Sequence, residues 1–191
     1  MRLFTDLGIE YIHHYAPLHY LPFIGRSRSL KSKPALERGG FSASHCRSTS
    51  SRTDMKRGFG DYAFLTLQKD PRILKAKLSG GFPHIELLVP VDAFVGINFD
   101  LCRYNVAKCR RTTESPTGGF KPDGTNGNYY DGKMLPIARS EPEKEALLRT
   151  HYLAGQMIEV LVPDEFRLPD NTCVACYHRQ DLQFAQSVKA S

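Results

Sequence analysis

One run of apolar residues with an acid inside it constrains the fold more than any other stretch. Residues 155–163 read Gly-Gln-Met-Ile-Glu-Val-Leu-Val-Pro. A continuous apolar run with β-branched residues is typical of a strand covered on both faces. An unpaired carboxylate is costly to bury there. Glu159 therefore faces a polar cleft, has a dedicated partner as a catalytic or ligand-binding group, or reaches solvent at a strand end.

Length and composition favour an ordinary globular protein. The chain has 191 residues, of which 41% are hydrophobic and 24% charged, so we expect a single domain over 1–191, with room for a long insertion. No apolar run approaches the roughly 18 residues that a membrane span needs, and the first residues do not predict a secretory signal. Five cysteines without an export signal favour the reducing cytoplasm.

The cysteines offer one short motif, Cys173-Val-Ala-Cys176. A zinc site would need Cys102 and Cys109 to converge on this pair. Because Cys173 and Cys176 lie in a strand-like run, we expect them to be small buried hydrophobic residues, and we expect no metal.

Positive charge is concentrated in two segments. The formal net charge is +6, and residues 26–57 and 103–111 carry most of the excess. Such patches attract phosphate backbones. The alternative is a solvated basic surface.

Hydrophobic patterns and turn signals predict a mixed α+β fold. Two long loops, a basic one over 26–60 with room for one helical turn and a glycine-rich one over 112–133, interrupt it. We expect Gly25 to end a short helix and Ser140 to begin another. The predicted strands cover residues 9–15, 62–67, 82–90, 155–163 and 172–177, and the predicted helices cover 17–25, 70–79 and 142–149.

Four segments, in this order, resemble the DarT family of nucleic-acid ADP-ribosyltransferases. They are Ile-His-His-Tyr at 12–15 followed by Leu-Pro-Phe-Ile at 21–24, Gly-Asp-Tyr-Ala-Phe-Leu at 60–65, the apolar run at 82–89, and Gln-Met-Ile-Glu-Val-Leu-Val-Pro at 156–163. Ala16 and Tyr20 stand where that family has Thr and Asn.

The resemblance implies an ADP-ribosyltransferase fold, in which two facing, mostly antiparallel sheets enclose a central NAD cleft and helices lie at the periphery. It implies cleavage of the nicotinamide–ribose bond and transfer of ADP-ribose to a base of DNA or RNA. A cytoplasmic toxin or phage-defence effector of this kind would have an antitoxin or chaperone as partner.

The resemblance also assigns roles to residues. Glu159 would be the catalytic carboxylate, stabilising the electron-deficient ribosyl centre. His14 and the adjacent Tyr15 would contact NAD, whereas His13 lies on the opposite strand face. The alternative for His14 is a core histidine bonded to a backbone carbonyl.

Other side chains complete the predicted NAD site. Tyr62 or Phe64 would stack on nicotinamide, unless they are ordinary core aromatics. Arg52 or Arg57 would contact the pyrophosphate or polarise the target base, with Arg47 as a third candidate. The alternative for each arginine is a solvated loop position.

The loop over 112–133 and the basic residues before it would read the nucleic acid. Tyr129 and Tyr130 would stack on bases, and Arg110 and Arg111 would lie on flanking phosphates. Chemistry on a base requires it to be unstacked, which favours single-stranded substrates.

Two other functions agree with the same residues. One is an ADP-ribosyltransferase that modifies a protein or another acceptor, such as an RNA 2′-phosphate. The other is a non-catalytic basic module that binds nucleic acid, which would show salt-sensitive binding without nicotinamide release.

Overall fold

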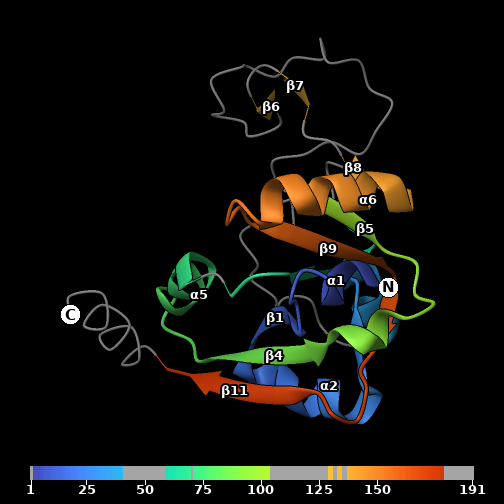
Figure 1. Ribbon diagram of the computed structural model, residues 1–191. Coiled ribbons are helices and arrows are strands. Elements are labelled where there is room, and N and C mark those ends of the chain that lie inside the picture. The colour runs from blue at the N-terminus through green and yellow to red at the C-terminus, as the bar shows by residue number, and fades with distance from the viewer. Residues whose placement is uncertain are drawn as a thin grey trace. The chain divides into compact units, whose positions relative to one another are not determined.

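Short helices and largely antiparallel strands make up the part of the chain that the computed structural model describes, residues 2–40, 59–69, 71–103, 129–130, 133–134 and 137–178 (Figure 1). The mixed α+β prediction is confirmed at this level. The chain forms two compact units, each assembled from separate segments. Unit 1 comprises Met1–Ser29, Leu65–Val95 and Arg167–Ser191, and unit 2 comprises Leu30–Phe64 and Gly96–Phe166.

Three strands in the order β11-β4-β1 form the sheet of unit 1. Both pairings are antiparallel, and Tyr15 of β1 and Ala175 of β11 both lie opposite Glu86. The end of β3 adds Thr66 opposite His13. The strands are β1 (Tyr11–Pro17), β4 (His84–Pro90) and β11 (Cys173–Tyr177).

The two faces of this sheet differ in chemistry. Partner residues share a face, and alternate residues of a strand point the same way. One face carries Ile12, Ile85 and Leu87, all almost fully buried, together with His14. The other, which we call the polar face, carries several side chains that can donate or accept hydrogen bonds, among them His13, Tyr15, Glu86 and Tyr177.

Short helices accompany the sheet of unit 1. The helix predicted over 70–79 is confirmed. The prediction that Gly25 ends a helix is wrong: the helix continues to Ser27, and Arg28 ends it by adopting φ 53° and pairing with Asp170. The elements are α1 (Arg2–Thr5), η1 (Leu18–Tyr20), α2 (Leu21–Ser27), α5 (Pro71–Leu78) and η3 (Val91–Phe94).

Four strands in the order β3-β9-β5-β8 form the main sheet of unit 2. The register of β5 and β9 places Cys102 opposite Glu159. The unit boundary passes through β3 and through the small pair β2–β10. The strands are β2 (Ser29–Lys31), β3 (Tyr62–Thr66), β5 (Asp100–Arg103), β6 (Tyr129–Tyr130), β7 (Lys133–Met134), β8 (Ile137–Ala138), β9 (Ile158–Pro163) and β10 (Glu165–Arg167).

The helices of unit 2 begin at clear caps. Ser140 and Glu143 form a reciprocal capping box at the start of α6 (Glu141–Leu147), as the sequence predicts for Ser140. A π-helical turn, η5 (Leu148–Tyr152), continues it. The predicted loop over 26–60 contains one short helix, α3 (Lys33–Arg38), capped by Ser32, in agreement with the helical turn that the prediction allowed, but the prediction is wrong for β2.

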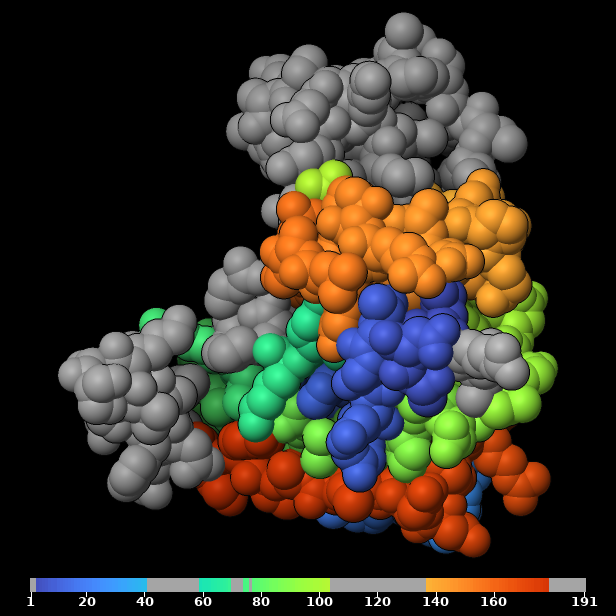
Figure 2. All heavy atoms as spheres, in the orientation of Figure 1, coloured from blue at the N-terminus to red at the C-terminus, as the bar shows by residue number. Residues whose placement is uncertain are grey.

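The burial of each described cysteine depends on the position of its strand in the sheet. Cys102, on β5 inside the sheet of unit 2, is buried. Cys173 and Cys176 are exposed, so the prediction of buried side chains is wrong for both. β11 is the last strand in its sheet order, and Figure 2 shows red atoms of this C-terminal region at the surface. An outermost strand has fewer neighbours to cover its side chains.

Candidate functional site

Glu159 lies on β9, where all five residues before Pro163 are buried. Only 6% of Glu159 is exposed, so the alternative of a strand-end glutamate that reaches solvent is wrong. Its partner Cys102 is completely buried. A carboxylate on a paired, buried strand is held in one place, which is what a preorganised site requires.

Aromatic and apolar side chains occupy the face of the sheet that carries Glu159. Cys102 shares this face by register, and Leu161 shares it by alternation along β9. Both belong to a cluster with Phe59 and Tyr62, against which Phe64 and Ile137 pack. Tyr62 is therefore buried in this cluster and Phe64 is partly buried against it, and the stacking of either ring on nicotinamide stays a prediction.

Polar side chains lie close to the start of β9, where Gln156 precedes the first strand residue Ile158. The backbone N–H of Gln156 donates to the carbonyl of His151 at 3.0 Å. Burial, followed by the charge of Arg103, lowers the pKa of His151 despite a hydrogen bond with the Gln156 side chain. Arg103 lies opposite Ile158, on the sheet face that does not carry Glu159. Arg103 begins the basic segment 103–111 identified from the sequence, whereas His151 was not predicted as a site residue.

Asp164 fastens the other end of β9. It follows Pro163 directly and adopts φ 54°. Its Oδ1 accepts hydrogen bonds from Ser32 Oγ at 3.1 Å and from Arg38 Nη2 at 2.8 Å. Its backbone N–H donates to the carbonyl of Asp61 at 2.7 Å. One residue thus ties the end of the Glu159 strand to the segments on both sides of residues 41–58.

The residues that the resemblance assigns to NAD on β1 point to opposite sheet faces. His14 lies on the face with Leu87, and Tyr15 lies on the polar face. Tyr15 is 6% exposed and donates its hydroxyl proton to Glu86 Oε1 at 2.9 Å. The assignment of His14 and Tyr15 to NAD stays a prediction, and the alternation along β1 places one of them on each face of the sheet.

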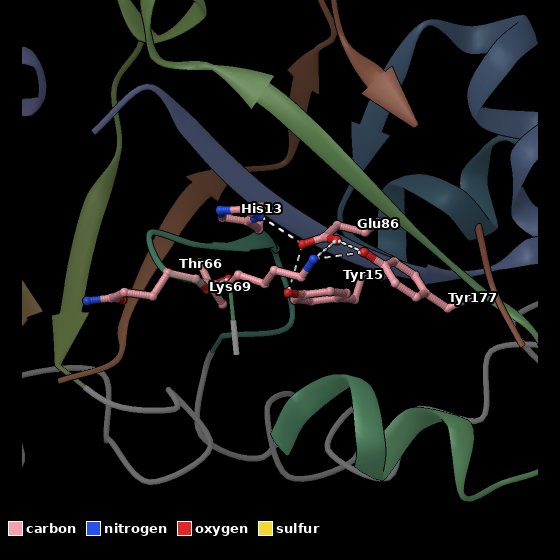
Figure 3. A network of polar contacts seen from close by, with 7 residues as sticks. His13, Tyr15, Thr66, Lys69, Glu86 and Tyr177 are labelled. Atoms are coloured by element: carbon pink, nitrogen blue, oxygen red, sulfur yellow. Dashed lines mark hydrogen bonds and ion pairs between the residues drawn. The ribbon is translucent and has the colours of Figure 1, made fainter. Parts of the chain in front are cut away.

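Glu86 is the centre of a cluster of polar side chains that contact its carboxylate (Figure 3). This carboxylate is 1% exposed. Its Oε1 lies 2.8 Å from His13 Nδ1, and its Oε2 accepts a hydrogen bond from the Tyr177 hydroxyl at 2.6 Å. Lys69 Nζ lies 3.7 Å from the same Oε2 and donates to the Tyr177 oxygen at 3.0 Å. We call these five residues, His13, Tyr15, Lys69, Glu86 and Tyr177, the Glu86 cluster.

The cluster keeps Glu86 ionised. Burial alone would raise its pKa, but the hydrogen bonds from His13, Tyr177 and Tyr15 and the charge of Lys69 outweigh burial and lower the pKa to about 2. The hydrogen bond with Tyr177 raises the pKa of Lys69 against the effect of burial. A carboxylate with so low a pKa and four partners is a poor general base at neutral pH. Glu86 is therefore a residue that positions its neighbours.

The sequence also carries a signal for Glu86. Residues 85–90 read Ile-Glu-Leu-Leu-Val-Pro, and β9 reads Ile-Glu-Val-Leu-Val-Pro, which agree at five of six positions. A carboxylate inside an apolar strand needs a partner, and this requirement holds equally for Glu86 and Glu159. The sequence therefore identifies Glu86 as a partnered carboxylate, although it does not identify the four partners, which come from distant segments.

The remaining predicted site residues are five arginines and two tyrosines. The arginines Arg47, Arg52, Arg57, Arg110 and Arg111 fall outside the described residues. Tyr129 and Tyr130 form β6, which pairs with β7. Their roles stay predictions. Within the described ranges, no three His, Cys, Asp or Glu side chains come together as a candidate metal site, and no described helix has the length and apolar character to cross a membrane.

Comparison of the chain with models of protein families, with curated proteins and with solved structures gives no match. The function of this chain is therefore inferred from its own residues and from the four motifs that resemble the DarT family.

Proposed function

We propose that this protein is an NAD-dependent transferase that moves ADP-ribose onto a base of single-stranded DNA or RNA, with Glu159 as the catalytic carboxylate. The observation that carries the proposal is the placement of Glu159: a carboxylate 6% exposed, on a paired strand whose sequence is similar to the catalytic strand of the DarT family.

The surroundings of Glu159 suit the ribose and nicotinamide end of NAD. A carboxylate accepts hydrogen bonds from ribose hydroxyls, and its charge stabilises positive charge that develops on the sugar. Tyr62 and Phe64 supply aromatic surface on the face that Glu159 shares. Nicotinamide is flat and carries positive charge in NAD, so aromatic rings are suitable neighbours.

The proposed reaction has a simple balance. The bond between ribose C1′ and the nicotinamide nitrogen breaks, and its electron pair leaves with nicotinamide. A nitrogen or oxygen of the acceptor base forms the new bond to C1′ and gives up a proton. Glu159 is our candidate to accept that proton, and Arg52 or Arg57 is our candidate to orient the pyrophosphate or the base.

The test is the reaction itself. Short DNA and RNA oligonucleotides are incubated with NAD and the purified chain, and mass spectrometry reads the addition of one ADP-ribose group and the release of nicotinamide. Glu159→Gln preserves the shape of the side chain and should reduce transfer by at least about 100-fold, in the range typical for loss of a catalytic group.

The matched control is Glu165→Gln. Glu165 is half exposed on the neighbouring strand β10 and makes one ion pair, with Lys31 at 3.4 Å. This variant should retain transfer. Equal activity of wild type and Glu159→Gln would refute the assignment of Glu159. Binding of oligonucleotides without any nicotinamide release from wild type would favour the non-catalytic module, and labelling of protein instead of oligonucleotides would favour the alternative acceptor.

A further inference from the structure

The protons of the Glu86 cluster can be assigned from its geometry and from the ionised state of Glu86. An ionised carboxylate only accepts hydrogen bonds. Tyr15 and Tyr177 therefore donate to Glu86, and His13 must carry its proton on Nδ1, the nitrogen 2.8 Å from Oε1. Neutral histidine has one protonated ring nitrogen. In the neutral form, Nε2 of His13 is therefore the unprotonated nitrogen, and it accepts hydrogen bonds.

This nitrogen is open to a ligand. In Figure 3 the His13 ring nitrogen that does not contact Glu86 points away from the carboxylate. The His13 side chain is 13% exposed, and its ring makes only the Nδ1 contact within the described residues. Nε2 is also not among the fully buried polar atoms that lack a partner. A histidine whose other nitrogen is fixed by a carboxylate is the common arrangement of functional imidazoles.

Lys69 provides the second open position of the cluster. Its ammonium has three N–H groups. One donates to Tyr177 and a second faces Glu86 Oε2 at 3.7 Å, which leaves one for another acceptor. The Lys69 side chain is 56% exposed, so this donor reaches solvent. His13 and Lys69 contact the two oxygens of one carboxylate, so an acceptor and a cationic donor belong to the same cluster.

We propose that His13 and Lys69 form a binding site for a sugar phosphate group: His13 Nε2 accepts a hydrogen bond from a sugar hydroxyl, and Lys69 pairs with the phosphate. A hydroxyl donor next to an anionic acceptor complements the two open positions. Because it names ADP-ribose as the ligand, this inference rests on the proposed function, and it adds two residues that the sequence did not single out for binding.

The first test observes His13 directly in the full chain. At pH 8, ¹⁵N-correlated NMR should show His13 with a protonated Nδ1 and an unprotonated Nε2. Addition of ADP-ribose, which carries hydroxyls and a pyrophosphate and cannot undergo transfer, should shift the His13 ring signals. A protonated Nε2 at this pH, or His13 signals that do not respond to millimolar ADP-ribose, would overturn the proposal.

Variants separate binding from folding. His13→Asn keeps an N–H donor near the position of Nδ1 and removes Nε2, so it should fold normally and weaken ADP-ribose binding. Lys69→Ala should weaken binding roughly tenfold, the effect of one charge-assisted contact. Lys75→Ala removes the same charge from an exposed position of α5 and should leave binding unchanged. Equal losses from Lys69→Ala and Lys75→Ala would show a general charge effect and overturn the site.

The outcomes distinguish this inference from the proposed function. If oligonucleotide transfer depends on Glu159 but ADP-ribose leaves His13 unchanged, the inference fails alone. If no transfer occurs and ADP-ribose still shifts the His13 signals with the expected dependence on Lys69, the binding site stands without the proposed reaction.

Discussion

Glu86 and Glu159 each lie four residues before the proline that ends a buried strand, β4 in unit 1 and β9 in unit 2. Their strands agree in sequence, and both carboxylates are almost fully buried. Their surroundings differ: Glu86 contacts a histidine, two tyrosines and a lysine, whereas Glu159 shares its face with an apolar and aromatic cluster. The local sequence determines burial in both, and distant segments determine the chemistry.

The stability that Glu86 contributes should depend on pH. Its pKa in the folded protein is about 2, below the usual 4.5. Its contribution is therefore fully present above pH 4.5 and is lost as the pH falls toward 2. At pH 7, Glu86→Gln should lower the free energy of unfolding by about 3 kcal/mol, the value of a shift of this size.

Urea unfolding of wild type and Glu86→Gln at pH 7 and pH 3 checks this expectation. The difference between the two proteins should fall to less than half by pH 3, because below pH 4.5 the unfolded chain takes up a proton on Glu86 while the folded protein keeps Glu86 ionised. A difference that stays the same at both pH values would show that Glu86 is not held ionised by its neighbours.

Tyr177→Phe should loosen the C-terminal strand. The variant removes the 2.6 Å hydrogen bond to Glu86 and the acceptor of Lys69. A hydrogen bond to a charged group contributes roughly 1.5–3 kcal/mol, so the free energy of unfolding should fall by about that amount. Amide hydrogen exchange of β11 should also accelerate relative to that of β1.

Tyr11→Phe is the matched control for this change. Tyr11 lies at the start of β1 and is 41% exposed. Removal of its hydroxyl should leave stability within about 0.5 kcal/mol of wild type, as for most surface changes. Equal effects of the two substitutions would contradict a special role of the Tyr177 hydroxyl.

The sequence predicted elements whose signals are local. Ser140 marks the start of α6 because its capping box needs only residues within four positions. The helix that follows Asp70 and the strands around Glu159 and Tyr62 were predicted for the same reason. Gly25 failed as a stop signal because a glycine only permits a left-handed turn, and here Arg28 makes that turn with Asp170 as its partner.

The elements and contacts that the sequence missed depend on distant segments. β2 has three residues, too few to show a period, and it exists by pairing with β10. The hydrogen bonds of the Glu86 cluster join residues separated by up to 108 positions in the chain. No local pattern identifies Tyr177 or Lys69 as partners of Glu86, whereas the demand of a buried carboxylate for some partner is visible in the strand itself.

The exposed cysteines of β11 should react with alkylating reagents and should not pair with each other. Three residues along a strand span about 10 Å, beyond the roughly 7 Å limit for a disulfide. Cys173 and Cys176 also point to opposite faces. Under native conditions, iodoacetamide followed by peptide mass spectrometry should label both rapidly and Cys102 slowly. Formation of a Cys173–Cys176 disulfide with mild oxidant would contradict the strand.

Asp164 should tolerate glycine better than alanine. At φ 54° an L-residue with a Cβ is strained by roughly 1–2 kcal/mol, and asparagine and aspartate adopt this conformation most readily. Asp164→Ala would keep the strain and lose the hydrogen bonds from Ser32 and Arg38, whereas Asp164→Gly would lose only the hydrogen bonds. Asp164→Asn keeps an oxygen acceptor and the preference for this turn.

Thermal unfolding of the three variants should therefore give the order Asn, Gly, Ala from most to least stable. The expected loss for Asp164→Ala is about 2 kcal/mol, and the gap between Gly and Ala should be about 1 kcal/mol, since the larger unfolded-state entropy of glycine offsets part of the relieved strain. If Asp164→Ala is as stable as Asp164→Gly, the left-handed turn after Pro163 does not hold the end of the strand that carries Glu159.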